Sequence, residues 1–256
     1  MTDADLGALL VHDRYVRSNG YDPGWVVANM MGPNPLWLLE HLLEVLPIEP
    51  GMRVLDLGCG KGLTSVFLAR ETGAQVWATD LWIGATDNLG RFRDAGVDDL
   101  VFPIHAEARD LPYADGFFDV VVSIDSFQYF GTDDTYLAYL TRFLRPGGRI
   151  GVVDPALFRE LGTEVPAELA HLWQCQGLPF HGPDWWRTHW AKTGLVTVDV
   201  ADAVPDGWRD WLRWSEVVGP LADAAWKRAA AANEVELLRI DQGELIGFTR
   251  IVATRP

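Results

Sequence analysis

The sequence predicts an α/β fold built on a doubly wound, mostly parallel sheet. From Gly51 onward, apolar segments typical of strands alternate with segments of helical spacing, a pattern that produces a parallel sheet with right-handed crossovers. The apolar segments are nearly continuous, as expected of strands that helices cover on both faces. The first five predicted strands occupy residues 53–58, 74–80, 100–106, 117–125 and 147–155.

Helical segments separate these strands, and each ends at a glycine or at Pro-Gly. They are predicted over residues 61–73, 84–96 and 133–147. A later helix begins at Pro183 and ends before Gly194, with Trp186 and Trp190 on one face, which we expect to be structural. Two further strands, predicted to be neighbours, complete a seven-stranded sheet at residues 195–202 and 244–255.

The composition limits the kinds of partner. The net charge of -15 would repel nucleic acid and anionic membranes, so we expect neither as a partner. Neutral or cationic small molecules remain. Of the two cysteines, Cys59 lies within a glycine turn, which argues against a disulfide with Cys175 and agrees with a reducing cytoplasm. The N-terminus lacks the pattern of a signal peptide, so we expect a soluble, cytoplasmic protein.

A glycine-rich turn follows the first predicted strand, in the stretch RVLDLGCGKGLTS. A Walker loop needs Ser or Thr after its lysine, but Gly62 follows Lys61. The dinucleotide fingerprint needs a third glycine where Leu63 stands. Asp56, at the end of the strand, would repel a pyrophosphate. The turn therefore predicts a ligand with an ammonium or sulfonium group and no phosphate, lying close to bare backbone.

Two acidic residues follow the glycine-rich turn along the chain, each at or directly after the end of a predicted strand. Asp80 ends the second strand, where a carboxylate can accept hydrogen bonds from both hydroxyls of a ribose. Glu107 follows the third strand and precedes Leu-Pro-aromatic and an acid. The segments VLDLGCGKG, ATD, HAEARDLPYADGFFDVVVS and FLRPGGRIGVVDP together resemble the successive motifs of the class I S-adenosylmethionine-dependent methyltransferases. The resemblance covers roughly residues 30–155 and recurs at 183–200 and 244–255.

The resemblance implies a Rossmann-like methyltransferase fold with the last strand antiparallel. It also implies roles for residues in the cofactor site, with S-adenosylmethionine bound and S-adenosylhomocysteine released. Asp56 and the loop of Gly58, Cys59, Gly60 and Gly62 would line the methionine half, and Asp80 would hold the ribose. Near the adenine we expect Leu81 and Trp82 against the ring, Glu107 or the Ala108 amide at its amino group, and the Ser123 backbone beside the cofactor. Family members usually have Asp at the position of Glu107.

Candidate catalytic residues follow the fourth strand, because parallel sheets place ligands at the carboxyl ends of strands. On the substrate side we expect Asp125, Ser126, Gln128 and Tyr129, and Asp125 is a candidate base or cation anchor. Relatives often carry His or Glu where Gln128 stands, and glutamine cannot act as a base. His181 is a further candidate for the substrate pocket. His181 and His189 lack a third ligand at suitable spacing, so no metal site is predicted.

We expect one methyltransferase domain over residues 1–256. Residues 1–50 would form a helical cap, residues 51–155 the cofactor-binding core, and residues 156–182 and 205–240 inserts over the substrate site. The predicted reaction is methyl transfer to a small molecule, with N, O, S and C nucleophiles left open and an amine favoured. A non-catalytic sensor or partner subunit that binds the cofactor is the alternative. A homodimer is left open.

Overall fold

The computed structural model describes residues 3–162, 164–173 and 177–256, so Cys175 lies outside the described residues. In this part of the chain, one sheet contains seven strands in the order β3-β2-β1-β4-β5-β7-β6. The strands are β1 (Arg53–Leu57), β2 (Gln75–Asp80), β3 (Val101–His105), β4 (Phe118–Ile124), β5 (Leu144–Leu157), β6 (Thr197–Ala203) and β7 (Ile246–Thr254).

The first five strands run parallel, and β7 lies antiparallel between β5 and β6. This arrangement confirms the predicted seven-stranded, mostly parallel sheet with an antiparallel last strand. The strand order reverses between β1 and β4, which are direct neighbours. In open α/β sheets, ligands bind at the carboxyl ends of the strands beside such a reversal.

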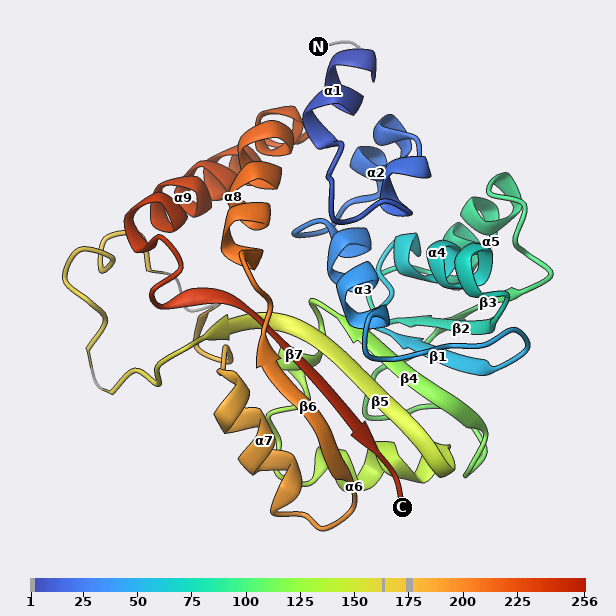
Figure 1. Cartoon of the computed structure of the whole chain (residues 1–256). Coiled ribbons are helices and arrows are strands. Elements are labelled where there is room, and N and C mark those ends of the chain that lie inside the picture. The colour runs from blue at the N-terminus through green and yellow to red at the C-terminus, as the bar shows by residue number, and fades with distance from the viewer. Residues whose placement is uncertain (1–2, 163, 174–176) are drawn as a thin grey trace.

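Helices cover both faces of the sheet (Figure 1). Apolar side chains of α3, α4 and α5 pack on one face, and those of α6 and α7 pack on the other. Trp186 and Trp190 of α7 are fully buried, which confirms their structural role. These helices are α3 (Pro35–Leu43), α4 (Leu63–Thr72), α5 (Ala85–Asp94), α6 (Tyr136–Leu140) and α7 (Pro183–Ala191).

The remaining helices gather at one end of the molecule, as Figure 1 shows. Pro35 starts α3, and the Asn34 side chain accepts a hydrogen bond from Leu36 N, so this helix has the proline and cap expected of a first turn. Within the described residues, no helix has the length and apolar character needed to cross a bilayer. The end group comprises α1 (Asp3–Leu10), α2 (Pro23–Asn29), α8 (Gly207–Val218) and α9 (Ala225–Asp241).

The two predicted inserts differ in structure. Residues 205–240 contain α8 and nearly all of α9. After the last two residues of β5, the described part of 156–182 is mostly irregular and lies beside α9 and the start of β7. Phe158 N donates to Leu245 O, and the Asn233 side chain donates to Leu172 O. Their position over a substrate site stays a prediction.

Candidate active site

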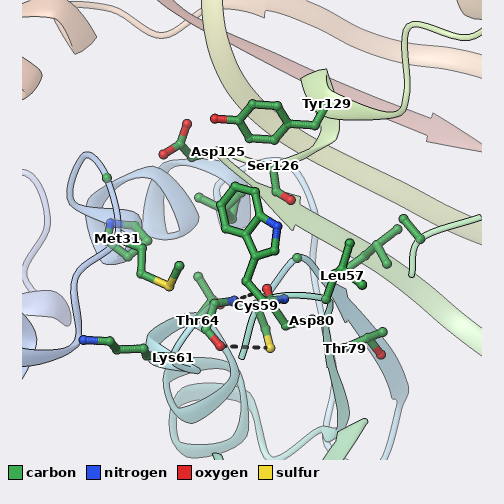
Figure 2. Close-up of a pocket in the computed structure, with 18 of the residues that line it drawn as sticks. Met31, Leu57, Cys59, Lys61, Thr64, Thr79, Asp80, Asp125, Ser126 and Tyr129 are labelled. Carbon is green, nitrogen blue, oxygen red and sulfur yellow. Dashed lines mark hydrogen bonds between the residues drawn. The ribbon is translucent and has the colours of Figure 1, made fainter. Parts of the chain in front are cut away.

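A cavity opens at the carboxyl ends of the parallel strands (Figure 2). The cavity has a volume of about 220 Å³ and is open to solvent. In Figure 2, Asp125 and Tyr129 lie on one side, and Cys59 and Asp80 lie across from them. Residues from each of the first four strand ends line it, together with the α2–α3 connection: Met31, Gly32, Pro33, Gly58, Cys59, Gly60, Lys61, Asp80, Leu81, Trp82, Glu107, Ala108, Arg109, Asp125, Ser126 and Tyr129 are among them.

The glycine loop after β1 presents backbone to this cavity. Gly58 and Gly60 have φ of 77° and 55°, in the left-handed region that favours glycine. A Cβ on Gly58 would lie 1.9 Å from Ser126 Oγ, and one on Gly60 would lie 2.8 Å from Met31 Sδ. A Cβ at either position would therefore require Ser126 or Met31 to move, and the positive φ adds strain for any residue other than glycine. Gly62 differs, because it packs against the Phe92 ring of α5 and does not line the cavity.

Asp56 lies behind the loop. The side chain is 1% exposed, and both Thr64 Oγ1 and Ser65 Oγ donate to its Oδ2 at 2.6 Å. Burial raises the pKa of Asp56 to about 6, although these two hydroxyls oppose the shift. The residue is not among those that line the cavity. In this structure, Asp56 ties β1 to the first turn of α4.

Asp80, at the end of β2, lines the cavity and braces the loop. Its Oδ2 accepts from Gly60 N at 2.8 Å, and its Oδ1 accepts from Trp82 N and Ile83 N at 2.7 and 2.9 Å. A carboxylate has about four lone-pair sites, so acceptor capacity remains for a ligand hydroxyl. The exposed side chains of Leu81 and Trp82 lie beside it at the rim.

The loop after β3 contributes Glu107 and Ala108 to the lining. The Glu107 carboxylate accepts from Arg109 N at 2.9 Å and from its guanidinium at 3.1 Å. Arg109, which also lines the cavity, is thus already paired with an acid. The second basic lining residue, Lys61, donates from Nζ to Ala28 O at 3.0 Å.

The turn after β4 brings three predicted catalytic residues together. Asp125 has φ of 50°, and its Oδ1 accepts from Gln128 Nε2 at 3.4 Å. Its Oδ2 reaches Gly32 so closely that a Cβ there would lie 2.2 Å away. Burial and the Glu234 charge raise the pKa of Asp125 to about 7, while the Gln128 hydrogen bond opposes the shift. The Tyr129 hydroxyl points toward Asp125 in Figure 2.

Other predicted residues lie outside the cavity lining. Ser123 is fully buried, and its Oγ donates to Leu57 O at 2.8 Å between β4 and β1. Gln128 is 1% exposed and reaches the cavity only through Asp125 and its neighbours. His181 stacks on Trp185 at 3.7 Å between ring centroids and bonds to Glu160 at 3.0 Å. These contacts place His181 beside α7.

The sequence placed residues 1–50 in a helical cap but did not single out residues 29–35, which form one side of the cavity. Met31, Gly32 and Pro33 precede Pro35 in a short irregular stretch between two helices, and only the close approach to Gly60 and Asp125 reveals their position. Ser126, which we expected on the substrate side after the fourth strand, lines the cavity beside Asp125. Among the described residues, no cluster of three or more His, Cys, Asp or Glu is arranged to hold a metal ion.

Comparison with known proteins identifies the family. A model described as a methyltransferase domain matches residues 54–148. The O-methyltransferase rstn1 of Aspergillus nomiae is 31% identical over 172 residues, which are 64% of this chain and 73% of that protein. The chain belongs to the class I S-adenosylmethionine-dependent methyltransferases.

Other methyltransferases match to different extents. The 27-O-demethylrifamycin SV methyltransferase of Amycolatopsis mediterranei is 29% identical over 225 residues, covering 86% of this chain and 83% of that protein. The match to methyltransferase GfsG of Streptomyces halstedii, 37% identical over 118 residues, spans 46% of this chain and less than half of that protein, 42%. The structure of geranyl diphosphate C-methyltransferase from Streptomyces coelicolor shares the fold, with a TM-score of 0.66 and 19% identity over 85% of this chain and 78% of that one.

The cavity fits the cofactor of the methyltransferase family, S-adenosylmethionine. Gly58 and Gly60 form a cradle that a Cβ would fill, and Asp80 keeps acceptor capacity beside it. The basic residues Lys61 and Arg109 are engaged with a backbone carbonyl and an acid. A cationic, phosphate-free ligand therefore suits this lining better than a nucleotide does.

Proposed function

We propose that this methyltransferase transfers the methyl group of S-adenosylmethionine to a small-molecule amine. The observation that carries the proposal is Asp125, a half-buried carboxylate that lines the cavity across from the glycine loop. A buried carboxylate without a cationic partner is costly, and a bound ammonium group relieves that cost. The nucleophile type rests on this residue, because relatives include methyltransferases named for N-, O- and C-methylation.

A second acid strengthens the preference for a cation. Glu234 of α9 accepts from Trp211 Nε1 at 3.3 Å and from Ser215 Oγ at 3.2 Å, and its negative charge acts on Asp125. Trp211 and Ser215 belong to α8. Trp214 of the same helix donates from Nε1 to Gly32 O at 2.9 Å, and Gly32 lines the cavity. Among the described residues, the charge that helps to raise the pKa of Asp125 therefore belongs to another acid, Glu234.

The cofactor would occupy the glycine-loop side. We assign the backbone of Gly58 to Gly60 to the methionine half, Asp80 to the ribose hydroxyls, and the rim at Leu81 to the adenine. The bound cofactor supplies a methyl group on a positively charged sulfur. Asp56, Gly62 and Ser123 support this side from behind, since each packs or bonds within the loop and sheet.

Asp125 has two tasks in this scheme. Its carboxylate binds the ammonium form of the acceptor and then takes one N–H proton, which leaves a lone pair on nitrogen. A pKa of about 7 suits this exchange near neutral pH. Bound S-adenosylmethionine would supply the methyl group to this lone pair, and its sulfur would keep the electron pair of the broken S–C bond. Gln128 orients Asp125 by donating from Nε2.

A panel of acceptors tests the proposal. Amines, thiols, phenols and carboxylic acids are each incubated with the protein and S-adenosylmethionine, and formation of S-adenosylhomocysteine is measured. We expect amines to react fastest. Turnover of only neutral or anionic acceptors would reject the amine while leaving methyl transfer intact. Cofactor binding without turnover of any class would favour the alternative of a non-catalytic binding protein. Cytoplasmic localisation and a homodimer stay predictions.

A further inference from the structure

A buried carboxylate on β5 holds the turn that follows β4. Asp154 is fully buried, and its Oδ1 accepts from Ser126 N at 3.1 Å and from Phe127 N at 3.2 Å. Two successive backbone N–H groups therefore converge on one side-chain oxygen from a neighbouring strand, an arrangement that favours an acceptor with full or partial negative charge.

The turn held in this way carries the acceptor side of the cavity. Asp125, Ser126 and Tyr129 all line the cavity, and the intervening η2 (Phe127–Tyr129) is a single short 3-10 turn. Asp125 itself lies in the left-handed region at φ 50°, which L-residues adopt only when their surroundings enforce it. Its N–H donates to Val153 O at 2.8 Å, so β5 fixes this turn at adjacent positions.

We propose that Asp154 is a positioning residue, which sets the place of Asp125 and Tyr129 by accepting hydrogen bonds from the backbone of the turn between them. Its side chain touches neither cofactor nor acceptor in this scheme. The inference rests on the proposed function for its kinetic consequence, whereas its structural consequence is independent of the reaction.

Asp154 could act through the hydrogen bonds that Oδ1 accepts or through the charge of its carboxylate, and the second oxygen, Oδ2, helps to tell these two roles apart. Oδ2 has no hydrogen-bond partner among the described residues, and burial raises the pKa of the carboxyl well above its usual value. The hydrogen bonds of the turn use Oδ1 and need no net charge. An asparagine at this position keeps an amide oxygen for the same N–H groups, whereas an alanine removes every acceptor.

Asp119 offers a matched control at the other end of β4. Its Oδ2 accepts from Arg53 N at 2.7 Å, and its side chain is 17% exposed, so Asp119→Ala also removes a carboxylate that holds a neighbouring backbone. Asp119 does not line the cavity. Any loss that comes from weakening β4 in general will thus appear in both variants.

The experiment combines amide hydrogen exchange with steady-state kinetics on the full chain. In Asp154→Ala we expect the amides of residues 126–128 to exchange at least tenfold faster, and kcat/KM for the best amine to fall at least tenfold. The dissociation constant of the Asp154→Ala variant for S-adenosylhomocysteine should stay within about threefold of the wild-type value. Asp154→Asn should keep most of the protection and lie within about threefold of the wild type in kcat/KM. Asp119→Ala should leave residues 126–128 protected.

Several results would overturn the inference. Unchanged exchange at residues 126–128 in Asp154→Ala removes its structural basis, whether or not any acceptor is methylated. Equal acceleration there in Asp119→Ala shows a general effect on β4. If Asp154→Ala does not fold, Asp154→Asn decides: full protection with a large loss of kcat/KM would show that the ionisable oxygen, and not the hydrogen-bonded turn, is what matters. Failure of the amine proposal alone leaves the exchange result intact.

Discussion

Asp125 combines a rare backbone conformation with a desolvated carboxylate and a position on the cavity wall. These properties arise from contacts with Gly32, Val153 and Gln128, which lie on three separate segments. Strained residues collect at functional sites because the surrounding structure must over-determine them. The chemistry proposed for this site therefore depends on one residue.

Replacing Asp125 with Asn should reduce kcat/KM for an amine by about 100-fold or more, because it removes both the charge and the base. In the wild type, kcat/KM should rise with pH through about 7 as this carboxyl ionises, and Asp125→Asn should lose that limb of the profile. Steady-state kinetics from about pH 6 to 9 measure both effects. Asp119→Asn is the control, and an unaltered profile in Asp125→Asn would rule out the assigned role.

Gly58→Ala should weaken cofactor binding and lower the free energy of unfolding by about 1–3 kcal/mol, since the position has positive φ. The added Cβ would also lie 1.9 Å from Ser126 Oγ. Gly90→Ala is the matched control in α5, where a Cβ meets no atom within 4 Å. That change should stabilise the chain by about 0.5–1 kcal/mol. Urea unfolding and cofactor titration check both, and equal behaviour of the two variants would contradict the cradle.

Local patterns predict single residues of this site unevenly. The loop of Gly58 and Gly60 and the acid Asp80 are recognisable because each adjoins a strand end in a fixed motif. Asp56 also adjoins a strand end in this motif. Its carboxylate, however, accepts hydrogen bonds from two hydroxyls in the first turn of α4 and does not line the cavity. Glu234 lies more than 100 positions from Asp125 along the chain, so nothing local could link them.

At the scale of whole elements, the region of α7 shows different outcomes for Trp186, which was expected to be structural, and His181, which was a candidate for the substrate pocket. Trp186 is fully buried between the helix and the sheet, whereas His181 stacks on Trp185 and bonds to Glu160 just before the helix. The hydrophobic pattern of the helix identified the tryptophan correctly. His181 precedes the helix, and a residue outside a helix has no helical periodicity from which its orientation could be predicted.

Trp186→Ala should lower the free energy of unfolding by about 3–5 kcal/mol, as expected for a large aromatic side chain removed from a core. His181→Ala should change kcat/KM by less than about twofold, because its contacts lie at α7 and not at the cavity. Thermal unfolding and steady-state kinetics on both variants provide the measurement. A tenfold or larger loss of activity in a stable His181→Ala would return this residue to the active site.

Strand positions were predictable to within a few residues, but one helix and one strand differ from the prediction because of how the strands pair. The helix expected over residues 133–147 is reduced to α6 and η3 (Thr141–Phe143), because β5 already begins at Leu144. In turn, β5 continues to Leu157, since it pairs with β7 from Arg149 to that residue. Antiparallel pairing with a strand nearly 100 residues away cannot be read from the local pattern.

For the molecule as a whole, two acids with a raised pKa contribute to the pH dependence of stability. Burial raises the pKa of Asp56 to about 6 and of Asp125 to about 7, from 3.8 in an unfolded chain. Between these values the folded state holds protons that the unfolded state has released. The stabilisation is therefore complete below about pH 3.8 and is lost as the pH rises through about 6 and 7.

Asp125→Asn should accordingly flatten the fall in the free energy of unfolding between about pH 4 and 8, by on the order of 1–3 kcal/mol. Urea unfolding across that range tests this, with Asp119→Asn as the comparison. A variant whose stability follows the wild-type pH curve would show that Asp125 titrates normally in the folded chain.

The cavity's preference for a cationic, phosphate-free adenosine compound underlies every assignment above. Isothermal titration of the purified chain with S-adenosylmethionine, S-adenosylhomocysteine, NAD and ATP measures that preference. We predict one site per chain for S-adenosylmethionine and its demethylated product, weakened at least tenfold by Asp80→Ala, and little heat with NAD or ATP. Binding of NAD or ATP in place of S-adenosylmethionine would contradict it.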